Sequence, residues 1–234
     1  MIVARTQNLG SSRLARLAKR SPGSARAAED EHCELCGEPI PSRHRHLLDL
    51  EAGELRCACR ACSLLFDRPA AAQGNLRLVG DRRLRLDGFE LSDLAWEQLR
   101  IPVEMSFFFH SSKQGRVMAF YPSPMGATES LLGLEAWERL ERDNPVLAEL
   151  EPDVEALLVN RARGARQYFL VPIDECYSLV GLIRTRWKGL RGGAEVWEQI
   201  ARFFAELERR SRPAGQGREA NANAAATAVA AERR

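Results

Sequence analysis

Two C-x2-C pairs, separated by 22 residues, constrain the fold of this chain more than any other feature of its sequence. Cys33 and Cys36 form the first pair, and Cys59 and Cys62 form the second. Each pair is typical of a knuckle, a tight turn that directs two thiolates toward one point. Four thiolates at about 2.3 Å complete the tetrahedral shell of structural Zn²⁺. The spacer slightly exceeds the usual length of roughly 15–20 residues, but such loops tolerate insertion. The sequence therefore predicts a four-cysteine metal site.

A metal held by four thiolates has no open coordination position, so it cannot activate water as a catalytic zinc does. The same four thiolates suit a single iron of the rubredoxin type, and spacing alone does not separate the two metals. The segment is poor in the aromatic residues that usually surround such an iron. We therefore expect Zn²⁺ in a zinc-ribbon-like module, with Fe and electron transfer as the alternative.

Three further residues near the knuckles have the chemistry of metal ligands. Cys57 extends the second pair to C-x-C-x2-C, so it is a substitute for Cys59 or a small half-buried residue without a ligand role. His44 and His46 alternate along a predicted strand and face one side, which makes them candidates to surround the metal and hydrogen-bond its ligands. The order of cysteines and histidine resembles HNH-type nucleases, but the later Asn and His of that pattern are missing.

The remainder of the sequence offers no arrangement typical of an enzyme. Cys176 stands alone near the start of a predicted helix, and we interpret it as a small buried hydrophobic residue. There is no phosphate-binding Lys-Ser/Thr loop, no G-x-G-x-x-G and no paired carboxylates. We expect no catalytic activity.

Charge and hydropathy limit the partners and the compartment. The chain has 34 Lys and Arg against 32 Asp and Glu, a net charge of +2, so nucleic acid is not the expected partner. A nucleic-acid-binding zinc protein or an HNH-type nuclease is kept as a second alternative. No apolar run approaches 18 residues, and the N-terminus lacks a signal-peptide core. We expect a cytoplasmic protein with reduced cysteines.

Composition divides the chain into four parts: a disordered basic arm (1–30), the four-cysteine metal module (31–68), an α+β domain (69–211) and a disordered Ala-rich tail (212–234). In the module, a hairpin of residues 44–50 and 54–57 would bring the second knuckle beside the first. Leu64, Leu65 and Phe66 would form an apolar plug under the metal. Alternating leucines between 76 and 86 predict another hairpin around Gly80-Asp81.

The α+β domain shows a repeated order of elements. Predicted strands at 103–109 and 116–121 precede a helix at 129–142, and strands at 154–160 and 167–171 precede a helix at 175–187. Pro122 and Pro172 occupy equivalent places after the paired strands, which suggests a duplicated β-β-α unit. A last amphipathic helix is predicted for 194–210. We expect an antiparallel sheet with packed helices.

Several long phrases resemble an uncharacterised actinobacterial family encoded beside high-affinity nickel–iron hydrogenases. The resemblance covers about residues 31–210 and depends on HCELC, CACRACSLLFD, AFYPSPMGATES, DVEALLVNR and LVPIDECYSLVGLIRTRWKGLRGG. It implies no known activity. It does imply an accessory protein that supports assembly, maturation or function of a hydrogenase, with hydrogenase subunits or their assembly factors as protein partners.

Overall fold

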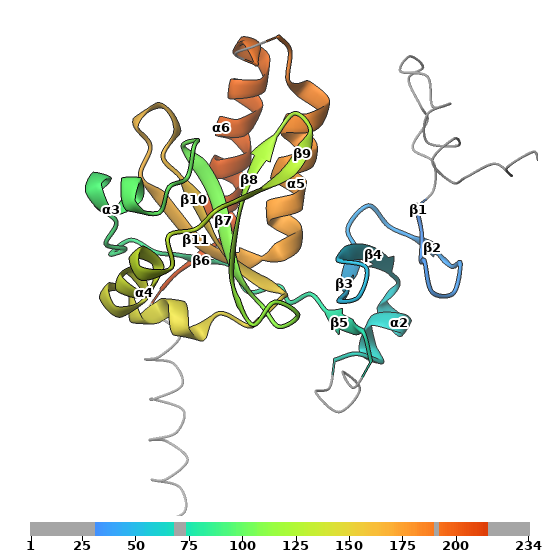
Figure 1. Cartoon of the computed structure of the whole chain (residues 1–234). Coiled ribbons are helices and arrows are strands. Elements are labelled where there is room, and N and C mark those ends of the chain that lie inside the picture. Colours follow the sequence, from blue (N-terminus) through green and yellow to red (C-terminus); the bar gives the residue numbers. More distant parts are fainter. Residues whose placement is uncertain (1–30, 68–73, 190–191, 215–234) are drawn as a thin grey trace, which may run out of the picture.

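The computed structural model describes residues 31–67, 74–189 and 192–214. The predicted basic arm and residues 215–234 of the predicted tail lie outside this part of the chain. The described residues form two lobes (Figure 1). The small lobe contains residues 31–67 and 74–79, and the large lobe contains the rest. None of the described helices is long and apolar enough to span a membrane.

The small lobe contains two short antiparallel sheets and one helix. Its elements are β1 (Glu31–His32), β2 (Pro39–Ile40), β3 (Arg45–Asp49), β4 (Glu54–Ala58), α2 (Arg60–Leu64) and β5 (Leu76–Leu78). The predicted hairpin is confirmed, because β3 pairs with β4 from Arg45↔Ala58 to Asp49↔Glu54. The Asp49 side chain accepts the amide of Ala52 at 3.0 Å and shapes the turn, where Gly53 has a φ of 66°.

The hairpin predicted around Gly80-Asp81 is wrong. β5 pairs antiparallel with the other edge of β3, and β6 (Leu84–Arg85) pairs with β11 (Gln167–Pro172) in the large lobe. The chain between these two strands therefore crosses from one lobe to the other. The alternating leucines belong to two different sheets, which their spacing alone did not reveal.

The large lobe is a seven-stranded sheet with helices on both faces (Figure 1). Its order is β12-β6-β11-β10-β7-β8-β9, antiparallel except for the parallel edge pair β12–β6. The remaining strands are β7 (Met105–Ser111), β8 (Arg116–Ser123), β9 (Gly126–Ser130), β10 (Glu155–Asn160) and β12 (Arg212–Pro213). The helices are α3 (Asp93–Gln98), α4 (Leu134–Asp143), α5 (Ile173–Arg186) and α6 (Gly193–Arg210), with 3-10 turns η2 (Pro145–Glu149) and η3 (Ala162–Gly164). The α+β class with antiparallel pairing is thus confirmed.

Successive side chains of the central strands point to opposite faces of the sheet, and a hydrophobic core lies on each face. Phe107 and Leu158 face α5 and α6, whereas Phe108 and Leu157 face α3 and α4. These four side chains are fully buried. The predicted apolar stripe of α6 packs into the first core through Val196, Ile200, Phe204 and Leu207. Continuous apolar runs in β7 and β10 follow from burial on both faces.

The predicted β-β-α repeat is present only in part. The second unit, β10–β11–α5, has the expected order. The first unit contains an additional strand, because β9 pairs with the end of β8, where the sequence predicted no further strand between residue 121 and the helix. Helix α4 consequently begins at Leu134 and not near Glu129, and it covers the opposite face from α5. Arg212 and Pro213, which the sequence analysis assigned to the tail, form the edge strand β12.

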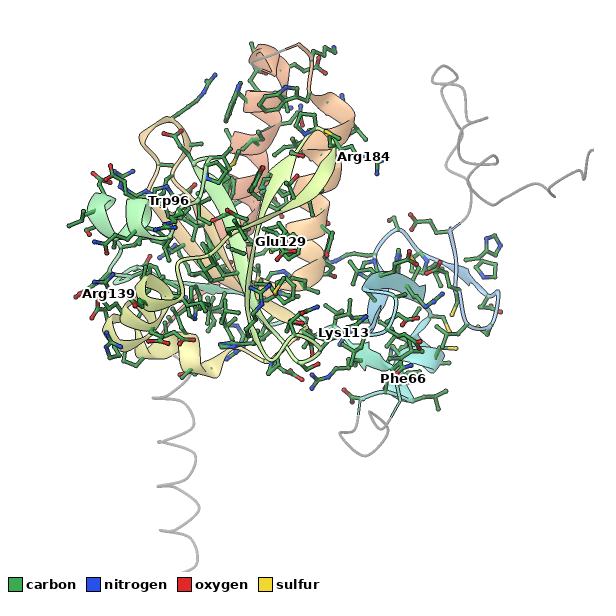
Figure 2. All side chains as sticks on the ribbon, viewed as in Figure 1. Phe66, Trp96, Lys113, Glu129, Arg139 and Arg184 are labelled. Carbon is green, nitrogen blue, oxygen red and sulfur yellow. The ribbon has the colours of Figure 1, made fainter. Side chains whose placement is uncertain are left out.

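The two lobes are in direct contact. Leu48 and Val79 of the small lobe are buried in the same core as α5 and α6. Arg77 contacts Asp153 at 3.1 Å. Lys113, which Figure 2 shows on the side of the large lobe that faces the small one, donates to the Glu51 carbonyl at 3.0 Å. The small lobe is therefore held by apolar packing and by polar contacts.

Candidate metal centre

Two tight turns position the four predicted cysteines. In the first knuckle, the Gly37 amide donates to the Cys33 carbonyl at 2.8 Å, and Gly37 has a φ of 78° that favours glycine. In the second knuckle, Cys59 is the N-cap of α2, and its sulfur accepts the Cys62 amide at 3.4 Å. The β3–β4 hairpin ends directly before Cys59, so the start of α2 lies beside the first knuckle.

Two hydrogen bonds connect the first knuckle to the strand that leads into the second knuckle. The Glu34 amide donates to the Cys57 carbonyl at 2.9 Å, and the Cys57 amide donates to the Glu34 carboxylate at 2.7 Å. These two hydrogen bonds tie the first knuckle to β4. They explain how cysteines more than 20 residues apart in sequence reach a common point.

The sulfur atoms of Cys33, Cys36, Cys59 and Cys62 all lie within 4.8 Å of one another. The Cys36 and Cys59 sulfurs are 3.8 Å apart. In a tetrahedron with metal–sulfur bonds of about 2.3 Å, neighbouring sulfurs are separated by about 3.8 Å. Figure 2 shows yellow sulfur atoms gathered in the small lobe. The donor set and its spacing therefore fit a tetrahedral metal ion.

The thiols of this cluster differ in acidity. Burial would raise the pKa of Cys33, but the amides of Cys59, Leu35 and Cys36 stabilise its thiolate and lower the pKa to about 6. Hydrogen bonding with the sulfurs of Cys36 and Cys59 raises the pKa of Cys62 to about 12. The Cys33 thiolate therefore forms readily, whereas Cys62 keeps its proton until a bound cation displaces it.

The predicted apolar plug under the metal is wrong for two of its three residues. Leu64 and Leu65, at the end of the short helix α2, are 60% and 66% exposed, whereas Phe66 is half-buried. The buried apolar residues of the small lobe are instead Ile40, Leu47, Leu48, Ala58 and Val79. The second knuckle therefore presents two large apolar side chains at the surface.

The structure places Cys57, His44 and His46 together, apart from the four-cysteine set. Their ligand atoms lie within 4.8 Å of one another. His46 and Cys57 are direct partners across the β3–β4 hairpin, and His44 is two residues before His46. From the sequence, Cys57 was interpreted as a substitute for Cys59 or a residue without a ligand role, and the two histidines as neighbours of the four-cysteine metal, so the three were not grouped.

Asp174 was missed as a site residue by sequence reasoning. Its carboxylate contacts His46 Nδ1 at 2.9 Å, across 128 residues of sequence, and no local pattern signals such a contact. Its neighbour Cys176 is fully buried, and burial together with Asp174 and Glu175 raises the pKa of its thiol well above the usual value. Cys176 therefore has the environment of a core residue.

The model of DUF5947, a family of unknown function, matches residues 32–211 of this chain. The match includes both lobes and both groups of candidate ligands. No curated protein and no solved structure matches this chain.

Proposed function

This chain belongs to DUF5947, a family of unknown function, and we propose that it is a non-catalytic, zinc-binding accessory protein. The observation that carries this proposal is the four-cysteine set, whose sulfurs lie within 4.8 Å of one another. Four thiolates satisfy Zn²⁺ completely and leave no position for substrate. A metal in this set stabilises the fold and does no chemistry.

Zinc bound by the four cysteines would hold the two knuckles, and the surface around them, in a rigid arrangement. The small lobe has few buried apolar residues, so metal binding supplies much of its folding free energy. The two knuckles carry the exposed apolar side chains of Leu35, Leu64 and Leu65. Apolar side chains held on a rigid support are suited to contact another protein. We propose that the knuckle surface, defined by these three leucines, binds the partner.

The proposed partner is a nickel–iron hydrogenase subunit or one of its assembly factors, in the cytoplasm. This part of the proposal comes from the resemblance of the sequence to proteins encoded beside such hydrogenases. A rigid binding surface without a catalytic site would suit a protein that supports assembly, maturation or function of the enzyme.

The test is affinity purification of the tagged full-length chain from a host that contains both genes. We expect hydrogenase subunits or assembly factors to be recovered with the unaltered chain and to be lost with Leu64→Asp/Leu65→Asp. The matched control is Leu94→Asp, which alters a side chain 64% exposed on α3 of the large lobe. Deletion of the gene with no change in hydrogenase assembly or activity would contradict the proposal. One thiolate-bound iron per chain would favour electron transfer instead.

A further inference from the structure

The small lobe contains a second group of metal-binding side chains. We propose that His44, His46 and Cys57 form a metal site separate from the four-cysteine set, and that this site holds Zn²⁺ with one coordination position open. The ligand atoms of the three residues already lie within 4.8 Å of one another. The β3–β4 register makes His46 and Cys57 direct neighbours, and His44, the residue before β3, has its ring centroid 4.7 Å from that of His46.

The hydrogen bonding of His44 leaves one ring nitrogen for a metal. Its Nδ1 lies 2.9 Å from the Pro41 carbonyl oxygen and 3.3 Å from the Glu31 carboxylate, and both groups can only accept. Nδ1 therefore carries the proton, and in the neutral imidazole Nε2 carries the lone pair. The side chain is only 7% exposed, and its Nε2 is buried without a partner in the described part of the chain. Leaving such an acceptor unpaired costs about 1–3 kcal/mol.

His46 is oriented in the same manner. Its Nδ1 is 2.9 Å from Oδ2 of Asp174 at the start of α5, so this nitrogen donates and Nε2 is again the free acceptor. A carboxylate that accepts from a histidine in this way fixes the ring and makes the other nitrogen a better ligand; it is a recurring arrangement behind zinc-bound histidines. Asp174 is thus a positioning residue, supplied by the large lobe.

The number and kind of ligands favour an open zinc site. Two imidazoles and one thiolate suit Zn²⁺, and three protein ligands with a free fourth position are typical of zinc that binds a further ligand. A cavity of about 740 Å³ adjoins the group and is lined by His44, His46 and Asp174. Arginines also line it, namely Arg43, Arg45, Arg60 and Arg83. Cys57 does not line this cavity, so water or a small ligand would reach the fourth position from the side of the two histidines.

The test is metal titration of the metal-free full-length protein with Zn²⁺, and with Co²⁺ for its spectrum. We expect two ions per chain in the unaltered protein. His44→Ala/His46→Ala should bind one ion and keep the intense sulfur-to-cobalt charge transfer of a four-thiolate site. The matched control is His32→Ala, which removes an exposed histidine outside the group and should leave two ions bound.

Two further variants separate a metal site from a structural contact. Cys57→Ser preserves size and should lose or weaken the second ion even if the double histidine variant fails to fold. Asp174→Asn should lower the affinity of the second ion by roughly tenfold to a hundredfold without changing the first. One ion per chain in the unaltered protein, or two ions of unchanged affinity in folded Cys57→Ser and Asp174→Asn, would overturn the proposal.

Discussion

Cys33 and Cys62 would lose their protons under very different conditions. Amide donors lower the pKa of Cys33 to about 6 against the effect of burial, whereas contacts with the sulfurs of Cys36 and Cys59 raise the pKa of Cys62 to about 12. At neutral pH the first is a thiolate and the second is a thiol. A metal ion that binds all four sulfurs must therefore displace protons.

This difference predicts a pH dependence of metal affinity. Because Cys62 is protonated in the free protein and deprotonated in the bound state, affinity should rise with pH from about 6 to 8 and fall on acidification. Competition against a chromophoric chelator at several pH values measures this change of metal affinity. Cys176→Ala, a core variant, should follow the same curve. An affinity that does not change over this range would contradict the assignment of thiolate ligands.

Replacement of glycine by alanine should change the free energy of unfolding in opposite directions at two positions, Gly192 before α6 and Gly181 within α5. Gly192 has a φ of 82°, and a Cβ there would lie 2.8 Å from Val196 Cγ1. Gly192→Ala should therefore lower the free energy of unfolding by about 1–3 kcal/mol. Gly181, an exposed position in α5, has nothing within 4 Å of the place that a Cβ would occupy.

Gly181→Ala should raise the free energy of unfolding by about 0.5–1 kcal/mol, because alanine has the higher helix propensity. Urea denaturation of both variants beside the unaltered protein measures the two changes. Equal effects of the two substitutions would contradict the left-handed, crowded backbone at Gly192 or the open helical position of Gly181.

Elements whose partners are close in sequence could be predicted from the sequence. The β3–β4 and β10–β11 hairpins and the apolar stripe of α6 depend on short turns and regular spacing. The β8–β9 hairpin was missed because Pro122 was interpreted as the end of a strand. β8 pairs with β7 only as far as Phe120, so Pro122 lies where the strand has β9 as its single neighbour and needs fewer amide donors.

Contacts between distant segments could not be predicted. The pairing of β5 with β3 and the His46–Asp174 contact join residues that carry no shared local pattern. The spacing of two local pairs predicted the four cysteines as one group, and their sulfurs lie within 4.8 Å of one another, whereas the group of His44, His46 and Cys57 was not predicted. Its members come together only when the strand register and the position of α5 are known.

The molecule as a whole combines a large lobe with two apolar cores and a small lobe with little core of its own. Removal of metal should therefore loosen the small lobe and spare the large one. Hydrogen–deuterium exchange with and without chelator measures this difference. We expect faster exchange in the knuckles and β4, and unchanged protection in β10 and β11. Equal acceleration throughout, or none, would contradict a metal-supported small lobe.

Metal content of the purified full-length chain, measured together with its visible absorbance, decides whether the four cysteines hold zinc. We expect colourless protein with tightly bound zinc, and loss of one zinc in Cys36→Ser/Cys59→Ser compared with Cys176→Ala. Iron with thiolate charge-transfer bands would contradict the zinc assignment. Protein that binds no metal at all would contradict the four-cysteine site itself.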